Sequence, residues 1–448
     1  MKQIAAFVCF LSLGVSAQDR DFIADISKSA SRPTIAVPDF HGVGAAQTVM
    51  NTFNTIFATE LSDSGALKMA PKDFYPATVP QQPADFKLGG ASLGQWFGPP
   101  VSANYLAFGY ASVQDTTLVL YGWLFNVGQP DPVAAKLIGK LYYGSLDSKG
   151  AKKVAQEFAA DILRQFGVKS LTGTKIYFVS DRSEFREIWS MDYDGSNPQQ
   201  VTNHKSTSRH PAVSADAKVL AYTSLALRPG EKVPNWQVML QSTETGKRLP
   251  FNNPAAPTNG WPEFVPDGRR LLFASTLTDW AQVYVANLDG SDRRRLTNIN
   301  AIDVSPRVNP KTGNDVLFIS GRSGKQQLWR MNIDGGDLEM VTNGEGEVAN
   351  PAWSPDGRLI AFSWTQGFEL GGFNIFIMDI ANRKPIQLTK DSGVNENPWF
   401  APDGLHLVYS SKRGNTTQIF TMLLDGTHVR AVTQSANNTQ PVWAAALQ

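Results

Sequence analysis

Two short glycine-containing stretches have residue types and spacings that could support chemistry. Residues 90–94 read Gly-Ala-Ser-Leu-Gly, the pattern of a hydrolase nucleophile elbow in which Ser92 would attack a carbonyl carbon. That elbow needs a strand before it and a helix after it, whereas this serine lies in a stretch rich in glycine and proline. Gly42 and Gly44 separate a strand pattern from a helical pattern, as in a dinucleotide site, but Gln47 replaces the third glycine. We therefore expect no catalytic residue and no cofactor at either stretch.

The five histidines also lack the spacing of metal ligands. None forms a pair on one helix, and the single cysteine excludes both a disulfide scaffold and a cysteine-based zinc site. We therefore expect no bound metal. His204 and His210 lie in a loop between two repeats and are better candidates for contact with a partner. His406 lies in a strand pattern, which is typical of ordinary packing.

The composition is that of a folded and nearly neutral protein. The length of 448 residues predicts two or three domains, and a hydrophobic fraction of 42% is enough for a sizeable core. The formal net charge is +1, because 41 Lys and Arg residues are balanced by 40 Asp and Glu residues. Nucleic-acid binding through bulk charge requires a basic surplus, so we expect no nucleic-acid partner.

Residues 1–17 have the organisation of a secretory signal peptide. A short positive start is followed by the apolar run Ile4–Leu13 and by small residues before a cleavage site expected after Ala17. Such a run is too short to cross a bilayer, which requires about 20 apolar residues. Cys9 lies inside the run rather than after it, so lipidation is not expected. We predict an exported protein without a membrane span.

Residues 18–170 mix helical and strand patterns and predict a small α/β domain of the α+β kind, preceded by an N-terminal arm. Residues 71–100 are rich in proline, glycine and glutamine and are expected to form a surface connection. The order of the elements predicts helices packed on an antiparallel sheet. We expect strands over 34–40, 104–113, 117–127 and 134–143, and helices over 45–61 and from a Ser148 cap to about residue 166.

From residue 171 to residue 448 one phrase returns at intervals of 43 to 51 residues. Each copy has a proline that opens a short strand, at Pro211, Pro262, Pro306, Pro351, Pro398 and Pro441. Pro-Asp-Gly turns follow three of these prolines, and the repeats close on Thr202, Thr297, Thr342, Thr389 and Thr433. Four strands in a repeat of this length predict an all-β propeller. The first repeat lacks its proline strand and residues 440–445 supply one, so we predict six blades closed by the C-terminal strand.

The repeat phrase and the N-terminal half resemble the TolB family. Pro-x-aromatic, Ser-Pro-Asp-Gly and a closing Leu/Val-Thr form the TolB-type repeat, although prolyl oligopeptidase-like enzymes carry similar repeats. Residues 32–40, Ser64-Gly65 and residues 176–181 also match, and the resemblance covers essentially the whole chain after residue 17. It implies a periplasmic, non-enzymatic component of the Tol-Pal envelope system with roles in envelope integrity and cell division. The implied partners are a Pal-type peptidoglycan-associated lipoprotein and a TolA-type inner-membrane protein.

The chain departs from the family pattern at two places. Lys152 and Gln156 stand where the family often has an arginine and a histidine near the end of the domain helix. In the second repeat, residues 214–217 replace the Pro-Asp-Gly turn and Leu249-Pro250 replaces the closing threonine. These departures affect the identity of the partners more than the fold.

Propeller geometry predicts which face binds a partner. Each closing threonine ends an outermost strand and the next proline opens an innermost strand, so the loop between them crosses one face towards the axis. Loops on a rigid scaffold commonly build binding sites. The candidate contact residues are His204, Arg209, His210, Asp303, Glu345, Glu347, Asn350, Asn395, Glu396 and Asn397. By the resemblance, the N-terminal arm couples to the TolA-type partner, and its residues include Asp19, Arg20, Phe22 and Ile23.

Two other functions fit a propeller of this kind. An exported propeller-type peptidase or its subunit would need a hydrolase domain of about 200 further residues, which the chain lacks. A glycan-binding propeller would need exposed aromatic side chains at the channel mouth, and Trp236 is the most prominent aromatic residue in the face loops. Both remain alternatives to the protein-binding function.

Overall fold

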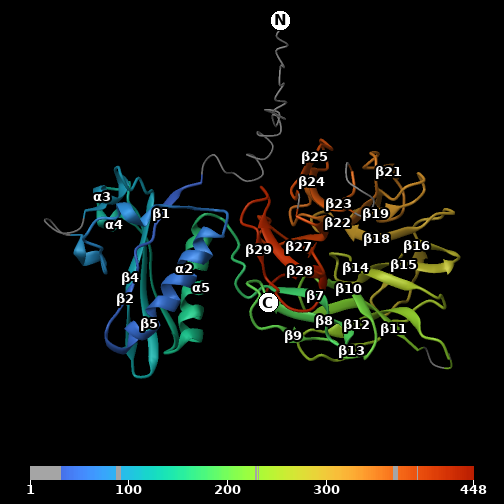
Figure 1. The fold of residues 1–448 in the computed structure, drawn as a ribbon, viewed down its shortest axis with the longest axis horizontal. Helices are drawn as coiled ribbons and strands as arrows, with labels where there is room; N and C mark the ends of the chain where they lie inside the picture. The colour runs from blue at the N-terminus through green and yellow to red at the C-terminus, as the bar shows by residue number, and fades with distance from the viewer. Residues whose placement is uncertain are drawn as a thin grey trace, which may run out of the picture.

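The computed structural model describes residues 32–86, 92–227, 230, 232–366, 372–390 and 392–447. A small α/β domain and a β-propeller lie side by side (Figure 1). The predicted signal peptide and the four named residues of the N-terminal arm lie outside the described residues. Among the described helices, none is both long enough and apolar enough to cross a membrane.

The N-terminal domain is built on a mixed sheet with the strand order β3-β1-β4-β5-β6, in which β2 also pairs with β4. The three long strands form an antiparallel meander, while the short strands pair in parallel. The strands are β1 (Thr34–Ala36), β2 (His41–Gly42), β3 (Lys68–Met69), β4 (Tyr105–Gln114), β5 (Thr117–Asn126) and β6 (Lys136–Ser145). The expected purely antiparallel sheet is therefore wrong, because a helix crosses over between β1 and β3 and returns the chain in the same direction.

Two helices cover one face of this sheet. They are α2 (Met50–Ser62), which follows a 3-10 turn at Gly44–Val49, and α5 (Ser148–Gln165). Phe57 of α2 stacks on Phe158 of α5 with ring centroids 4.9 Å apart, and both rings are fully buried. Burying each such ring stabilises the fold by about 1.5–3 kcal/mol. Asp147 rather than Ser148 caps α5, since its carboxylate accepts from the Gly150 N–H at 2.7 Å.

The region between β3 and β4 packs over the other face of the sheet instead of forming only a surface connection. It contains two 3-10 turns, at Lys72–Phe74 and Pro83–Asp85, and the short helix α3 (Leu93–Phe97). Trp96 is fully buried, and the Phe86 ring lies 5.4 Å from the ring of Phe108 on β4. The apolar side chains of this polar-looking region therefore complete a second core. A further short helix, α4 (Pro132–Ala135), precedes β6.

The propeller has six four-stranded blades, as predicted. The first blade contains β30 (Asn438–Ala444), β7 (Lys175–Ser183), β8 (Phe185–Asp192) and β9 (Gln199–Gln200). The second contains β10 (Ser208–Val213), β11 (Val219–Ala226), β12 (Asn235–Ser242) and β13 (Arg248–Leu249), and the third contains β14 (Asn259–Phe264), β15 (Arg270–Thr278), β16 (Trp280–Asn287) and β17 (Arg294–Arg295). The fourth contains β18 (Asp303–Val308), β19 (Asp315–Ser320), β20 (Gln327–Asn332) and β21 (Glu339–Met340). The fifth contains β22 (Val348–Trp353), β23 (Leu359–Trp364), β24 (Asn374–Asp379) and β25 (Pro385–Gln387), and the sixth contains β26 (Val394–Phe400), β27 (His406–Arg413), β28 (Thr416–Leu423) and β29 (Arg430–Ala431).

The C-terminal strand closes the ring. β30 pairs antiparallel with β7, so that Thr439 lies opposite Val179 and Trp443 lies opposite Ile176. The first and last repeats are complementary fragments of one blade, which confirms the predicted closure. Pairing the two ends of the repeat region removes the open edges that an unclosed array of blades would leave.

Each closing threonine ties the outermost strand of its blade to the third strand. Thr342 Oγ1 accepts from the Leu328 N–H at 2.9 Å and donates to Gln327 Oε1 at 2.8 Å. The second blade lacks this threonine, but Asn253 takes over its role. Its Oδ1 accepts from the Val238 N–H at 2.8 Å and its Nδ2 donates to the Val238 carbonyl at 2.9 Å. The irregular second repeat therefore keeps its strand tether through a different residue.

We define the turn face of the propeller as the face that carries the Pro-Asp-Gly turns, and the loop face as the face crossed by the loops between blades. The N-terminal domain docks on the turn face, at the first and sixth blades. Lys152 on α5 forms an ion pair with Asp194 and donates to Ser196 Oγ at 2.9 Å, in the turn between β8 and β9. Arg32 pairs with Asp425 at 3.5 Å, in the turn between β28 and β29. These contacts leave the loop face open over the described residues.

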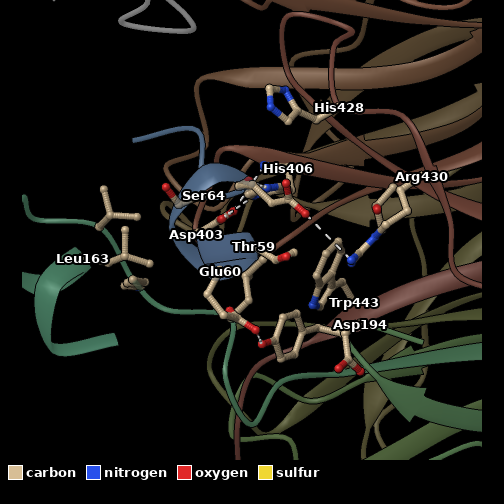
Figure 2. Close-up of a pocket in the computed structure, with 16 residues that line it drawn as sticks. Thr59, Glu60, Ser64, Leu163, Asp194, Asp403, His406, His428, Arg430 and Trp443 are labelled. Carbon is tan, nitrogen blue, oxygen red and sulfur yellow. Dashed lines mark hydrogen bonds and ion pairs between the residues drawn. The ribbon is translucent and has the colours of Figure 1, made fainter. Parts of the chain in front are cut away.

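His406 of β27 is a charged contact between the two domains (Figure 2). Its Nδ1 lies 2.6 Å from the Asp403 carboxylate, and its Nε2 lies 2.7 Å from the carbonyl oxygen of Asp63. Both neighbours are acceptors, so both ring nitrogens must donate and the imidazole must be protonated. Burial lowers the pKa of His406, but the charge and hydrogen bond of Asp403 outweigh it and the pKa is raised overall. The expectation of ordinary packing for His406 was therefore wrong.

The first family departure also lies at this interface. Gln156 Nε2 donates to the Tyr193 hydroxyl oxygen at 2.7 Å and to Glu60 Oε1 at 3.3 Å, and the Tyr193 hydroxyl donates to Glu60. Burial raises the pKa of Glu60, opposed by the hydrogen bonds from Tyr193 and Gln156. Lys152 and Gln156 therefore both hold the domains together. A partly open pocket of about 60 Å³ lies at the interface, and Figure 2 shows residues that line it.

Candidate functional site

Six residues, one from each blade, line the mouth of the central channel. Each immediately precedes the proline of its innermost strand and has a φ between 51° and 57°: His210, Trp261, Ser305, Asn350, Asn397 and Gln440. The strand pairing shifts at each of these positions, so they form six equivalent β-bulges. The proline thus lies inside the strand rather than opening it, and it is tolerated because this strand is an edge facing the channel.

The channel is closed by side chains that follow the bulges. Arg307 Nη1 lies 3.2 Å from Glu263 Oε2 of the neighbouring blade, and its guanidinium lies 4.9 Å from the centre of the Trp399 ring. Burial raises the pKa of Glu263 to about 7, opposed by the charge of Arg307. The remaining cavity is about 30 Å³, which holds one or two waters at most. A ligand larger than water must therefore bind on the loop face rather than inside the channel.

The candidate residues predicted from the sequence divide by exposure. His204 and Glu345 are exposed. Six others are half-buried on the loop face or at the channel mouth: Arg209, His210, Glu347, Asn350, Glu396 and Asn397. Asp303 and Asn395 are fully buried. The structure therefore brings the first eight to one face and places the other two inside their blades.

Asp303 and Asn395 position strands and do not face a partner. The Asp303 carboxylate accepts from Arg322 at 2.7 Å, and the Arg322 side chain is itself only 9% exposed. Asn395 Nδ2 donates to Asn374 Oδ1 at 3.2 Å and to the Gly393 carbonyl at 3.1 Å. A polar residue at the end of a loop therefore need not be a solvated tip, since here it satisfies buried polar groups of its own blade.

The basic side of the loop face is held rigidly. The Arg209 guanidinium lies 4.0 Å from the centre of the Trp236 ring, which links the start of β10 to the start of β12. His204 Nε2 lies 2.7 Å from the Tyr222 hydroxyl, and its backbone N–H donates to Glu187 at 2.6 Å. The His204 residue is exposed overall, but partial burial of its imidazole lowers its pKa. Because Arg209 covers one face of Trp236, that face is not open for stacking on a sugar ring.

Two segments on opposite sides of the loop face carry opposite charges. Lys205 lies in the loop that enters the second blade and Arg209 lies at the start of β10, whereas Glu345 and Glu347 lie in the loop that enters the fifth blade. These two blades lie three positions apart in a ring of six and therefore on opposite sides of the axis. A partner seated across the channel mouth would contact both segments, and complementary charges on it would favour one orientation.

The structure also bears on the other motifs. Ser92 is the residue before α3, a helix of five residues, and its side chain makes no capping hydrogen bond. Gly90 lies outside the described residues. Gly42 ends β2, and its N–H donates to Gln47 at 2.8 Å, so the turn is closed by the residue that replaces the third glycine. Within the described ranges, no three His, Cys, Asp or Glu side chains gather as a candidate metal site.

The channel residues Arg307, Glu263 and Trp399 were missed by the sequence analysis. Each directly follows one of the repeat prolines, at Pro306, Pro262 and Pro398. The signal that could have found them is this shared offset from the proline. The bulge at the residue before the proline was not recognisable, because the six residues at that position are of five different types.

A small α/β domain docked on the turn face of a six-bladed propeller, with the loop face left open, defines the class of the protein. The family model of the TolB beta propeller domain (PD40) matches residues 163–367 and 338–447. The chain therefore belongs to the TolB propeller family.

Comparisons with individual proteins agree with this assignment. The chain is 31% identical over 198 residues to a protein TolB homolog of Chlorobium luteolum, over 44% of this chain and 42% of that protein. It is 30% identical over 223 residues to a protein TolB homolog of Chlorobium chlorochromatii, over 50% of this chain and 47% of that protein. The matched part thus spans less than half the length of these relatives. The crystal structure of TolB from Acinetobacter baumannii matches with a TM-score of 0.71 and 22% identity, over 92% of this chain and 97% of that chain, which confirms the fold.

Proposed function

We propose that the protein is a periplasmic, non-enzymatic component of a Tol-Pal envelope system. It docks a Pal-type peptidoglycan-associated lipoprotein on the loop face and couples to a TolA-type inner-membrane protein through the N-terminal arm. Its role is to support envelope integrity and cell division. Membership of the TolB family supports the assignment to a Tol-Pal system, and the signal-peptide pattern of residues 1–17 supports the periplasmic location.

One observation carries the docking proposal. The N-terminal domain occupies the turn face, while the loop face presents Lys205 and Arg209 opposite Glu345 and Glu347 around a closed channel. Opposed charges on one rigid face favour a single docking orientation of a partner with complementary charges. A shallow face of loops suits a protein domain better than a small ligand, which needs a concave pocket.

Calorimetry with the purified soluble domain of the Pal lipoprotein from the same organism tests this proposal. Residues 18–448 should bind it saturably, and Glu345→Lys should weaken the affinity by about tenfold, because a charge at the interface changes sign. Glu244→Lys is the matched control, since Glu244 is also exposed but lies in a turn on the opposite face. Equal effects of the two substitutions would show that the binding site lies elsewhere on the protein. A folded protein that does not bind the Pal domain would show that Pal is not the partner.

The arm is tested separately from the face. A chain beginning at Ile26 should keep Pal binding and lose binding to the periplasmic C-terminal domain of TolA from the same organism. Retained binding to that domain would refute the role assigned to Asp19, Arg20, Phe22 and Ile23. The mass of the protein recovered from the periplasm should correspond to a chain that starts at Gln18.

A further inference from the structure

Among the described residues, no strand pairs with the outer edge of β6, the outermost long strand of the N-terminal domain. β6 is the last strand of its sheet and spans ten residues without a proline. The Tyr143 carbonyl accepts from Lys153 Nζ at 3.0 Å rather than from β5, so it points away from the sheet. Backbone groups alternate in direction along an antiparallel strand, so the N–H and C=O groups of Gly139 and Leu141 also point outward.

Apolar side chains accompany these outward backbone groups. Leu141 is 39% exposed and Tyr143 is 49% exposed, and they lie opposite Tyr121 and Val119 on the sheet face away from the two helices. Natural edge strands are usually blunted by charges, prolines or bulges that prevent pairing with another chain. Lys140 is the charge nearest the middle of β6, but it is bound to Asp161 of α5 at 2.7 Å and turned to the helix side.

A groove runs along this edge. It has a volume of about 900 Å³ and lies between β6, one side of α5, the segment 167–174 that joins the domains, and residues 445–447. Four consecutive residues of β6, from Lys140 to Tyr143, line it. Successive side chains of a strand point to opposite faces, so four in a row can line one groove only where the strand presents its edge.

The groove has an excess of positive charge. Its charged residues are the cations Lys140, Lys153, Arg164 and Lys169 and the carboxylates Glu157 and Asp161. Asp161 is shared by Lys140 and Arg164, and Lys153 lies 3.6 Å from Glu157, so both carboxylates are already neutralised. Lys169 is exposed. The charge left over is positive and favours an acidic occupant.

We propose that β6 and this groove form a docking site for an extended acidic segment of a partner protein, which adds to the sheet as a further strand. Its backbone would pair with the outward groups of Gly139 and Leu141 and with the N–H of Tyr143, as in other cases of strand addition to an open edge. The Tyr143 carbonyl is already bound by Lys153. Its apolar side chains would rest on Leu141 and Tyr143, and its carboxylates would face the cations of the groove. The site lies on the N-terminal domain and at its junction with the propeller, and it contains no residue of the loop face named above.

A defined peptide probes the site directly. A fluorescein-labelled decapeptide of alternating valine and glutamate should bind residues 18–448 saturably by fluorescence anisotropy at low salt. A decapeptide of alternating valine and lysine should bind at least tenfold more weakly. Hydrogen exchange should slow in residues 136–145 when the acidic peptide is present. Equal binding of both peptides, no saturable binding, or protection elsewhere in the chain would overturn the proposal.

Two substitutions distinguish the contribution of backbone pairing to peptide binding from the contribution of charge. Leu141→Pro removes an N–H that points away from β5 and should abolish binding while leaving the sheet paired. Lys169→Glu changes only an exposed charge and should weaken binding by about threefold. It therefore tests the proposal even if the Leu141→Pro variant misfolds. Lys247→Glu, at an exposed site on the propeller, is the matched control and should have no effect.

Two further results decide what occupies the edge. Self-association of the chain that Leu141→Pro abolishes would mean that a second copy occupies β6, which would overturn the acidic segment. Glu345→Lys should leave peptide binding unchanged. The strand-addition site and the proposed Pal-binding face can therefore fail independently of each other.

Discussion

The two faces of the propeller differ in what their polar side chains do. On the turn face, the Asp403 and Asp194 carboxylates are bound by His406 and Lys152, and they help to hold the N-terminal domain in place. On the loop face, Glu345 is exposed and Arg209 rests on a tryptophan of its own blade. The same repeat therefore builds a permanent interface on one side and an open charged surface on the other.

This difference shows how repeated blades of one fold can build two faces with different functions. The turns are short, and several of them repeat the sequence Pro-Asp-Gly or Asp-Gly, so they offer a compact surface on which a second domain can pack. The loops between blades vary in charge from one blade to the next, which lets one face recognise a partner in a single orientation. Two substitutions and a change of pH should affect the two faces differently, in decreasing order of expected effect.

Gly65→Ala should disrupt the turn face most. Gly65 has a φ of +67°, and a Cβ there would lie 2.7 Å from Leu423 Cδ2 of the propeller. Strain and overpacking together should cost about 2–5 kcal/mol of domain docking, measured by denaturant unfolding and by small-angle scattering. Gly167→Ala is the matched control, because Gly167 has a φ of +71° but no atom within 4 Å of the added Cβ. Equal losses for the two variants would show that strain alone acts at Gly65.

Thr342→Ala should loosen the loop face without affecting the turn face. The change removes the acceptor of the Leu328 N–H and the donor to Gln327, which should lower the free energy of unfolding by about 1–2 kcal/mol. Faster hydrogen exchange in residues 343–350 would report the loosened loop. Thr342→Ser keeps both hydrogen bonds and should restore the wild-type behaviour. Unchanged exchange in the alanine variant would show that the tether does not order this loop.

Raising the pH should weaken the domain interface by a smaller amount. The pKa of folded His406 is raised above its ordinary 6.5, so its contribution to docking is complete below pH 6.5 and is lost as the pH rises through the folded value. Glu60, whose pKa is raised above 4.5, acts in the same direction at lower pH. In the wild type, the unfolding midpoint of the N-terminal domain should fall as the pH rises above 6.5. In the His406→Gln variant, this fall should be absent. A variant with the same pH dependence as the wild type would assign that dependence to another group.

The propeller could be predicted from the sequence because its signals are local and repeated. The prolines, the Pro-Asp-Gly turns and the closing threonines each recur at one place in the blade, and the incomplete first and last repeats indicated the closure. In the N-terminal domain the strand that contains β1 was predicted, but its parallel pairing was not. Its neighbour β3 has only two residues, which is too short for a period. Asn253 was missed because an amide side chain replaced the expected threonine.

The site was predicted less completely, for reasons of distance and burial. The exposed residues of the loop face followed from the topology of the blades. The burial of Asp303 and Asn395 did not, because it depends on contacts with Arg322 and Asn374, which are about twenty residues away. The role of His406 depends on a carbonyl of Asp63, which lies 343 positions earlier in the chain. No local pattern can contain such a contact.

The hydrogen-exchange footprint of the Pal lipoprotein domain on the intact protein tests the contrast between the faces most directly. We predict slower exchange in residues 203–210 and 343–350 on opposite sides of the channel mouth, and unchanged exchange in the turns at residues 265–268 and 354–357. Protection confined to the turns, with the loops unaffected, would contradict the assignment of the loop face as the partner-binding surface.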